Sequence, residues 1–252
     1  MDNNANLTLA GRCGIVTGAS GGIGYAVAEA LAGAGATVYA VSRTGTVKDS
    51  SLPVCKGIVH LQGDVTDSKR MGEIVKAAGE KSGLDFLINN AGITEKCRAE
   101  DFPYEAFERI MQVNVHSVFR LCQQAYPYLK RSAHTGRIVN ISSMAAHLGF
   151  SLVTPYCISK SAVLGLTRGL AVEWAGDNIT VNSVAPGWFP SEMSKQVMDD
   201  ERRAAILARM PLHKFGDTRD LGAIVRFLLE DGATYITGQD FAVDGGALAY
   251  GY

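Results

Sequence analysis

Two side chains with complementary acid–base chemistry, Tyr156 and Lys160, stand four residues apart in the sequence. Residues at this spacing share one face of a helix, so a helix here brings a phenol beside an ammonium group. Free tyrosine has a pKa of about 10, and a neighbouring positive charge stabilises the phenolate. Lowering that pKa to about 7 requires roughly 4 kcal/mol, since one unit corresponds to about 1.4 kcal/mol. The pair predicts an acid–base site in which Lys160 lowers the pKa of Tyr156.

A hydroxyl group that can hold a substrate oxygen against the phenol precedes this pair. Ser143 stands thirteen residues before Tyr156. Its neighbour Ser142 is an equal candidate by residue type, and only the spacing favours Ser143. His147 follows on the same loop and is a candidate pocket residue, with a packed or solvated histidine as the alternative. Such a site transfers a proton and needs a hydride carrier beside it.

Short apolar runs alternate with longer amphipathic segments along the whole chain, which predicts a parallel sheet with helices on both faces. Strands are predicted over Gly14–Thr17, Thr37–Ser42, Gly57–Gln62, Leu84–Asn89, Gly136–Ser142, Ile179–Ala185 and Asp240–Val243. Helices are predicted over Gly22–Ala34, Ser68–Lys81, Tyr104–Arg131, Thr154–Ala175, Ser191–Arg209 and Thr218–Glu230. Polar residues over Thr44–Cys55 predict a loop where such folds usually carry a helix. We expect one α/β domain over residues 1–252, with a doubly wound parallel sheet of about seven strands.

A glycine-rich segment, Thr17-Gly-Ala-Ser-Gly-Gly-Ile-Gly24, lies between the first predicted strand and its helix. Glycines allow a tight turn and a close approach of the backbone to a pyrophosphate, while the helix N-terminus offers free N–H groups. Alone, this pattern also fits an ordinary strand–helix turn. The predicted contacts to a dinucleotide are Gly18, Ser20, Gly22, Ile23 and Gly24.

The end of the second strand selects between the two nicotinamide cofactors. An acid at this place holds the ribose 2′-hydroxyl of NAD, whereas an arginine suits the 2′-phosphate of NADP. The strand ends in Val41-Ser42-Arg43, with no carboxylate at the expected position. Arg43 can bind a phosphate through two N–H groups, and Ser42 adds a hydroxyl without charge repulsion. We predict NADP, with NAD as the less favoured cofactor and a solvated surface arginine as the alternative for Arg43.

Two further segments end strands at the edge where ligands bind in such sheets. Asp64-Val65 follows the third strand, and the carboxylate either approaches the adenine amino group, caps the next helix or binds loop amides. Asn89-Asn90-Ala91-Gly92 ends the fourth strand, and its asparagines either contact the cofactor or tie the edge of the sheet. We predict cofactor contacts at Asp64, Val65, Asn90, Ala91 and Gly92.

The composition restricts the class of protein. Asp and Glu number 25 against 24 Lys and Arg, so no overall charge points to nucleic acid or an anionic membrane. No apolar run approaches the roughly 18 residues of a membrane span, and the first residues lack the pattern of a signal peptide. Five cysteines without a Cys-x-x-Cys pair indicate buried thiols in a reducing compartment, with neither disulfides nor a metal site. We expect a cytoplasmic globular protein.

Taken together, these residues resemble the short-chain dehydrogenase/reductase family over nearly the whole chain. Seven features occur in the order typical of that family: the glycine loop, Asn89–Gly92, Asn114, Ser143, Tyr156, Lys160 and Pro186-Gly187. The resemblance implies a single Rossmann domain and a reversible hydride transfer between NAD(P) and an alcohol or carbonyl. It also implies a homo-oligomer, with a tetramer favoured over a dimer.

The same resemblance implies a role for each matching residue. Tyr156 is the general acid/base, Lys160 lowers its pKa and holds the nicotinamide ribose, and Ser143 orients the substrate oxygen. Asn114 perturbs a helix so that bound water completes a proton relay, although a hydrogen-bonded core amide is the alternative for it. Pro186, Gly187 and Ser191 contact the nicotinamide end, Ser191 standing where the family commonly has threonine. No metal is implied.

The substrate is predicted only by class. Apolar walls favour a medium-sized ketone or alcohol, with substrate contacts at Ser143, Ala145, His147, Tyr156, Trp188 and Phe189. The chain also resembles 3-oxoacyl carrier-protein reductases at Tyr235–Gln239 and Val243–Gly246, and sugar-acid dehydrogenases of the gluconate 5-dehydrogenase type across Pro186–Met193. Val172 stands where the carrier-protein enzymes commonly have a basic residue. A secondary-metabolite ketoreductase and a nucleotide-sensing protein without turnover are the remaining alternatives.

Overall fold

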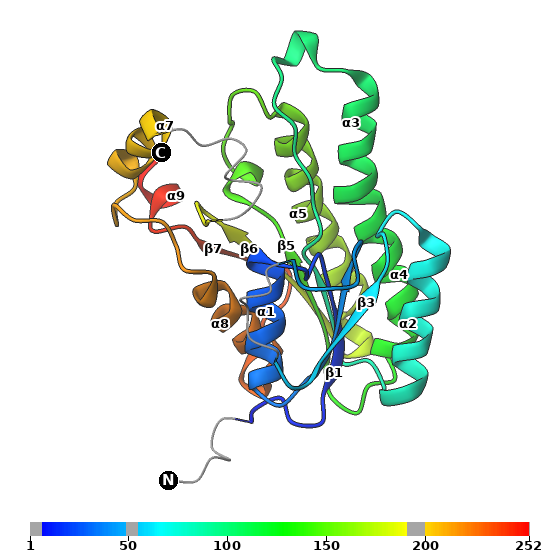
Figure 1. Ribbon diagram of the computed structural model, residues 1–252. Coiled ribbons are helices and arrows are strands. Elements are labelled where there is room, and N and C mark those ends of the chain that lie inside the picture. Colours follow the sequence, from blue (N-terminus) through cyan, green and yellow to red (C-terminus); the bar gives the residue numbers. More distant parts are fainter. Residues whose placement is uncertain (1–6, 49–54, 191–199, 252) are drawn as a thin grey trace.

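Seven strands of the described chain form one parallel sheet in the order β3-β2-β1-β4-β5-β6-β7 (Figure 1). The computed structural model describes residues 7–48, 55–190 and 200–251. The strands are β1 (Cys13–Thr17), β2 (Thr37–Ser42), β3 (Ile58–Gln62), β4 (Phe86–Asn89), β5 (Gly136–Ile141), β6 (Ile179–Pro186) and β7 (Asp240–Val243). This order confirms the predicted doubly wound sheet. From β1 the strands are added outward through β2 to β3, and from β4 they are added in the opposite direction through to β7. Ligands of such sheets bind at the carboxyl ends of the strands, beside the point between β1 and β4 where the order reverses.

Helices cover both faces of the sheet (Figure 1). On one face lie α1 (Gly22–Gly33) and α8 (Thr218–Leu229), which pack against each other. On the other face lie α2 (Ser68–Ser82), α4 (Ser117–Leu129) and α5 (Thr154–Trp174). The shorter helices are α3 (Tyr104–Met111), α7 (Asp200–Arg209) and α9 (Ala247–Tyr250).

Strands β1 to β6 contribute to two separate cores because successive side chains point to opposite faces. Leu87 packs in the cluster beneath α2, α4 and α5, and the next residue, Ile88, packs in the cluster beneath α1 and α8. Both side chains are fully buried, and burying one aliphatic side chain contributes about 1.5–3 kcal/mol. Burial on both faces explains why the strands read as continuous apolar runs and not as alternating patterns.

The predicted long helix over Tyr104–Arg131 is wrong as one regular element. A π-helical turn, Gln112–His116, separates α3 from α4, and α4 ends at Leu129. Asn114, at the centre of this turn, bonds to the backbone of Ile93 on another segment, which holds the extra residue in place. Single π-turns inside α-helices occur frequently at functional sites.

Other boundaries move by one or two residues, and four 3₁₀ turns were not predicted. These turns are Ala99–Asp101, Met144–Ala146, Ala175–Asp177 and Asp231–Ala233. The predicted helix over Ser191–Arg209 is observed as α7 from Asp200, because residues 191–199 lie outside the described chain. The predicted loop after β2 contains no helix at residues 43–48 or 55–57, and residues 49–54 are likewise outside the description.

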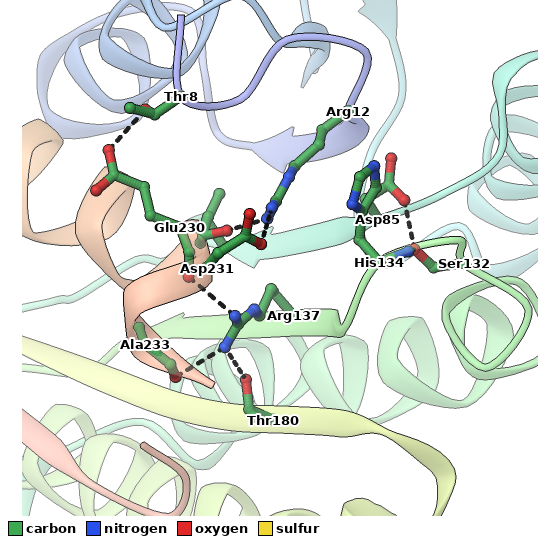
Figure 2. A network of polar contacts seen from close by, with 11 residues as sticks. Thr8, Arg12, Asp85, Ser132, His134, Arg137, Thr180, Glu230, Asp231 and Ala233 are labelled. Carbon is green, nitrogen blue, oxygen red and sulfur yellow. Dashed lines mark hydrogen bonds and ion pairs between the residues drawn. The ribbon is translucent and has the colours of Figure 1, made fainter. Parts of the chain in front are cut away.

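Two buried arginines tie the end of α8 to the amino ends of the strands (Figure 2). Arg12, before β1, forms an ion pair with Asp231, and Arg137 on β5 donates to the carbonyls of Glu230 and Ala233, both at 2.9 Å. Burial, together with the nearby Arg12, lowers the pKa of Arg137 to about 10, so it stays charged at neutral pH. Arg12 also donates to the carbonyl of Leu229, the last residue of α8, and the last carbonyls of a helix have no partner within the helix. This network lies at the edge opposite the carboxyl ends of the strands and serves stability.

The cysteine prediction holds only in part. All five cysteines are free thiols, but only Cys13 and Cys122 are buried, while Cys55, Cys97 and Cys157 are partly exposed. Within the residues that the structure describes, no group of three or more His, Cys, Asp or Glu side chains is arranged to hold a metal ion. In the same part of the chain, no helix combines the length and apolar character that a membrane crossing requires.

Candidate active site

Tyr156 and Lys160 lie one turn apart in the first part of α5 and face the same side. The Lys160 Nζ is 5.5 Å from the centre of the Tyr156 ring. The lysine is only 5% exposed, and its Nζ donates a hydrogen bond of 2.7 Å to the carbonyl of Ile141 at the end of β5. Pro155 near the start of α5 suits the first helical turn, where an N–H group has no partner. The helix thus brings the pair to the carboxyl edge of the sheet.

The pKa values differ from the sequence prediction. Burial raises the pKa of Tyr156, a hydrogen bond with Ser143 opposes this rise, and Cys157 adds to it, although the residue as a whole keeps some contact with solvent. Burial also lowers the pKa of Lys160 to about 8. The prediction that Lys160 lowers the pKa of Tyr156 is therefore wrong for the protein alone, because the ammonium binds the Ile141 carbonyl while the phenol is desolvated. At neutral pH the site holds a phenol and an ammonium.

Ser143, and not Ser142, faces the tyrosine. The side chains of Ser143 and Tyr156 are hydrogen-bonded to each other. The Ser143 Oγ also accepts a 3.1 Å hydrogen bond from the backbone N–H of Ala145, which begins a 3₁₀ turn. Ser142 is buried, and its hydroxyl donates to Asp240, the first residue of β7. The alternation of side chains at the end of β5 separates the two serines.

Asn114 reaches the same site through the π-turn. Its Nδ2 donates to the Ser159 hydroxyl at 3.0 Å, and the Ser159 Oγ donates to the carbonyl of Tyr156 at 2.8 Å. A side chain built on Gly92 would lie 3.3 Å from the Asn114 Oδ1 and 3.6 Å from the Lys160 Nζ. Asn114, Lys160 and the backbone of Gly92 therefore meet at one place. Both readings of Asn114 fit, since it is a buried, hydrogen-bonded amide that also borders the site.

The glycine segment forms a narrow cradle between β1 and α1. A Cβ at Gly24 would lie 2.4 Å from both the Asn90 Nδ2 and the Gly18 carbonyl oxygen, so only glycine fits. Gly18 has a φ of 67°, and a Cβ there would lie 2.9 Å from the Ala91 Cα. By contrast, a Cβ at Gly21 would meet no atom within 4 Å. Such a backbone cradle at a helix N-terminus fits the pyrophosphate of a dinucleotide.

Asn90 secures this cradle from the neighbouring strand. Its Nδ2 donates to the carbonyls of Thr17 at 2.9 Å and Gly18 at 3.2 Å, and its backbone N–H donates to the Thr17 hydroxyl at 3.0 Å. Asn89 is buried and its Nδ2 donates to Asn140 at 2.8 Å. Both asparagines thus tie the edge of the sheet, as the structural alternative held. Of the remaining predicted contacts in the loop, Ser20 and Ile23 are partly buried and Gly22 is exposed.

A polar cavity of about 480 Å³ lies at the carboxyl ends of β2 and β3. Its lining comprises Arg43, Gln62, Gly63, Asp64 and Arg70. Asp64 accepts from the backbone N–H of Thr66 at 2.9 Å, and this bond and, less strongly, Arg43 lower its pKa. It binds loop groups, while Asp67 caps α2. Val65 is partly buried and packs against the core cluster beneath α2, α4 and α5.

Ser42 differs from Arg43 in its surroundings. Arg43 is exposed, whereas Ser42 is buried and its hydroxyl accepts a 3.1 Å hydrogen bond from the N–H of Gly45. Arg70, a residue that the sequence analysis missed, directs its Nε to the carbonyl of Gln62 at 3.1 Å. Arg43 and Arg70 therefore bring two guanidinium groups to one cavity. Nothing in the spacing along the chain links them, since 27 residues separate the two.

The loops after β4 and β5 meet beside the acid–base pair. The N–H of Cys97 donates to the carbonyl of Leu152 at 2.9 Å, so the loops after β4 and β5 touch across the site. Phe150 and Trp188 form an edge-to-face pair with ring centres 6.1 Å apart. Phe189 and Ala145 are buried, so they shape the wall from behind.

Three predicted positions at the nicotinamide end remain. Pro186 ends β6, and Gly187 lies so close to Asp244 that a Cβ would be 2.6 Å from its Cα. Ser191 lies outside the described residues. His147, predicted as a pocket residue, contacts Asp240, at 2.6 Å between Nε2 and Oδ2. Asp240 is the second residue that sequence reasoning missed, because its partners are 57 to 98 positions away.

Comparison with known proteins gives consistent matches over almost the whole chain. A family model described as enoyl-(acyl carrier protein) reductase matches residues 18–247. The 2-dehydro-3-deoxy-D-gluconate 5-dehydrogenase of Bacillus subtilis is 38% identical over 251 residues, which are 96% of this chain and 96% of that protein. The 3-oxoacyl-[acyl-carrier-protein] reductase of Thermotoga maritima is 35% identical, with 95% and 99% covered. The crystal structure of a gluconate 5-dehydrogenase from Burkholderia cenocepacia with NADP and tartrate has a TM-score of 0.89 at 28% identity, covering 98% of this chain and 99% of that one.

Proposed function

The chain belongs to the short-chain dehydrogenase/reductase family of oxidoreductases, and from this premise we propose that it interconverts a carbonyl and a secondary alcohol with NADP(H). The substrate is a small to medium-sized molecule with an apolar part. One observation carries this proposal above all. Tyr156, hydrogen-bonded to Ser143 and one helical turn from a buried Lys160, lies at the sheet edge that also holds the glycine cradle.

The chemistry divides between the cofactor and the side chains. Bound NADP(H) supplies or accepts the hydride. In the reducing direction the Tyr156 hydroxyl donates its proton to the substrate oxygen, which avoids a free alkoxide and contributes about 10²–10⁴-fold. The Ser143 hydroxyl holds that oxygen against the phenol. The raised pKa of Tyr156 keeps the proton in place until the substrate oxygen takes it.

Lys160 and Asn114 support this proton transfer. With the cofactor bound, the Lys160 ammonium holds the nicotinamide ribose and stabilises the negative charge that the phenol oxygen gains when it gives up its proton. Asn114 is linked by hydrogen bonds through Ser159 to the backbone carbonyl of Tyr156. The π-turn that it forms is the proposed place for a bound water that completes the proton relay. Gly92, Pro186, Gly187 and Ser191 are the proposed contacts near the nicotinamide.

The charge around the cavity at β2 supports NADP over NAD. Arg43 and Arg70 line this cavity with the carboxylate of Asp64, and Arg70 also pairs with Glu73 at 3.5 Å. The 2′-phosphate of NADP carries about two negative charges, and a guanidinium group binds a phosphate through two N–H donors. The Ser42 hydroxyl accepts a turn N–H group, which leaves its own O–H group able to donate to the same phosphate beside the two arginines.

Sugar acids form the second candidate substrate class, because the similar Bacillus subtilis protein acts on a deoxygluconate. Such a substrate needs donors for a carboxylate. Two arginines near the mouth are already paired, Arg98 with Glu100 and Arg109 with Glu95. A carrier-protein thioester has less support, since Val172, 81% exposed, replaces the basic residue expected for docking. We therefore keep an uncharged ketone or alcohol as the first choice.

A panel assay tests the proposal. Purified protein is given NADPH with a small ketone (ethyl acetoacetate), a bulkier aromatic ketone and an acetoacetyl thioester, and NADP⁺ with D-gluconate. We expect turnover of a ketone and at least about tenfold weaker use of NADH than of NADPH. Tight binding of NADPH without turnover of any compound would instead favour a nucleotide-sensing protein.

The proposal extends to assembly and location. Phe119 on α4 and Ile158 and Val172 on α5 are 45%, 44% and 81% exposed, and a groove of about 920 Å³ runs between these helices. Apolar side chains gathered on neighbouring helices are typical of an interface between copies of a chain. We propose a homotetramer that uses this face. Free thiols at all five cysteines support a reducing compartment, the cytoplasm.

A further inference from the structure

A buried carboxylate lies directly behind the loop that carries Ser143. Asp240 is the first residue of β7 and pairs in register with Ser183 of β6. Its side chain is only 9% exposed. An ionised group is costly to bury unless hydrogen bonds compensate the lost water. The hydrogen-bond partners of Asp240 therefore show which groups stabilise the buried carboxylate and which parts of the chain it fixes in place.

Both carboxylate oxygens are occupied by side chains of the catalytic edge. The Oδ1 accepts from the Ser142 hydroxyl at 2.9 Å and from the Ser183 hydroxyl. The Oδ2 lies 2.6 Å from the Nε2 of His147. An ionised carboxylate only accepts, so the Nε2 of His147 carries the proton in this contact. Hydrogen bonds of this charged kind are about twice as strong as neutral ones.

These contacts hold the two ends of one short segment. Ser142 and His147 flank Ser143 and the 3₁₀ turn Met144–Ala146. Between the two ends, the Ser143 side chain turns the other way, toward Tyr156. Asp240 thus joins both ends of the segment to β7, while Ser143 projects from its middle.

From this arrangement we infer that Asp240 and His147 are positioning residues for Ser143. Neither side chain touches the phenol or the reacting atoms in our account. Their contribution is to fix the backbone from which the Ser143 hydroxyl meets the substrate oxygen. The inference rests on the proposed function, because it assigns Ser143 to the substrate. Precise placement matters, since a shift of about 1 Å at a reacting group can cost about 100-fold in rate.

A double-mutant cycle on Asp240 and Ser143 tests the inference. Asp240→Ala in the natural background should lower kcat/KM about 10–100-fold for the panel ketone used fastest, with the dissociation constant of NADPH changed less than about twofold. In the Ser143→Ala background the same substitution should change kcat/KM less than about threefold, because the group it positions is already gone. A purely structural role would give losses that multiply in the two backgrounds.

Matched variants separate position from stability. Asp240→Asn keeps an oxygen for the serines and offers His147 an N–H group, so it should retain most of the activity. His147→Ala should lose part of it, again only while Ser143 is present. Asp231→Ala is the control, because it also removes an ion-paired carboxylate but at the opposite edge of the sheet. Asp231→Ala should lower the melting temperature, but it should change kcat/KM by the same factor whether Ser143 is present or replaced by alanine.

A crystal structure of the Asp240→Ala protein provides a readout that needs no turnover. We expect the segment 142–147 to shift and the Ser143–Tyr156 hydrogen bond to be lost. An unchanged segment, or Asp240→Ala activity within about twofold of the natural protein, would overturn the inference. Absence of turnover with every panel compound would count against the proposed function, whereas the crystal structure would still decide whether Asp240 positions Ser143. If Asp240→Ala does not fold, Asp240→Thr and His147→Ala serve in the same cycle.

Discussion

Burial changes the pKa values of Tyr156 and Lys160 in opposite directions. The Lys160 ammonium donates one short hydrogen bond to the Ile141 carbonyl but loses most of its contact with water, which lowers its pKa to about 8. Tyr156 keeps its proton to higher pH than a free tyrosine. At neutral pH the site is therefore ready to protonate a carbonyl oxygen, the requirement of the reducing direction. The oxidising direction needs the phenolate and is favoured by higher pH.

The buried lysine gives the free energy of unfolding a characteristic pH dependence. Between pH 8 and 10.5 the unfolded chain binds a proton at Lys160 that the folded protein does not, so stability rises with pH across this window. Below pH 8 Lys160 is charged in both the folded and the unfolded protein, so the whole free-energy cost of burying the ammonium is present. Relative to Lys160→Met, the natural protein should gain roughly 3 kcal/mol over the window, at about 1.4 kcal/mol per pKa unit. Urea unfolding at a series of pH values measures this difference.

Lys76 provides the control for that series. It is an exposed lysine on α2, and its side chain is 66% exposed. Lys76→Met should therefore show no such slope relative to the natural protein. A flat difference for Lys160→Met as well would mean that the ammonium is not destabilised by burial.

The two arginines of the β2 cavity give a second prediction for single residues. Arg43→Gln and Arg70→Gln should each weaken binding of 2′,5′-ADP about tenfold or more, because a charged hydrogen bond contributes about 1.5–3 kcal/mol. Binding of 5′-AMP, which lacks the 2′-phosphate, should stay nearly constant. Isothermal titration with both nucleotides measures the effect. Equal losses for both nucleotides would show that the arginines do not recognise the 2′-phosphate, and an effect of Arg43→Gln alone would remove Arg70 from the contact.

At the scale of elements, the glycine turn shows how backbone shape and cofactor site depend on one another. Gly24 lies in the first turn of α1, at the point where β1, α1 and the Asn90 side chain come together. There is no room for a Cβ, so the same closeness that forms the cradle also fixes the helix against the sheet. At the other end of α1, Gly33 has open space around it.

These two glycines form a matched pair of variants. Gly24→Ala should lower the free energy of unfolding by about 1–3 kcal/mol, since it overfills a packed contact, and should abolish NADPH binding. Gly33→Ala should be neutral or stabilise by up to about 1 kcal/mol, the helix preference of alanine over glycine. Thermal unfolding and NADPH titration measure both effects. Retained NADPH binding in Gly24→Ala would contradict the assigned cradle.

The sequence predicts the elements better than the contacts between them. Strands buried on both faces leave continuous apolar runs, and all seven were predicted to within two residues. The resemblance implied that Asn114 perturbs its helix, but the pattern of the residues did not show the π-turn, because the turn depends on a bond from Asn114 to Ile93, 21 positions away. The same reason applies to Asp240 and Arg70, whose neighbours are brought close only by the sheet. The pair Tyr156 and Lys160 was predictable because its spacing lies within one helix.

At the scale of the whole molecule, the edges of the sheet have different tasks. The amino ends of the strands carry the buried Arg12 and Arg137, which hold the end of α8. The carboxyl ends carry the cradle, the acid–base pair and the polar cavity. The exposed apolar face of α4 and α5 stands apart from both edges and remains available for assembly. Stability, chemistry and proposed association thus use separate surfaces.

The proposed assembly gives a prediction at this scale. Val172→Glu places a charge in the proposed interface, so the protein should dissociate into smaller species, because a buried unpaired charge is costly. Val59→Glu is the matched control, since Val59 lies on the edge strand β3 and is 41% exposed. Light scattering coupled to size-exclusion chromatography measures the mass of each variant. An unchanged mass for Val172→Glu would exclude this face from the interface.

The most direct measurement of the central claim is the turnover of Tyr156→Phe, which removes one oxygen atom from the site. We expect kcat for the preferred panel ketone to fall by about 10²–10⁴-fold, while the dissociation constant of NADPH changes less than about twofold. Tyr104→Phe, the same change at an exposed tyrosine on α3, should leave both values unaltered. A Tyr156→Phe protein with kcat near that of the natural protein would contradict the assignment of Tyr156 as the proton donor.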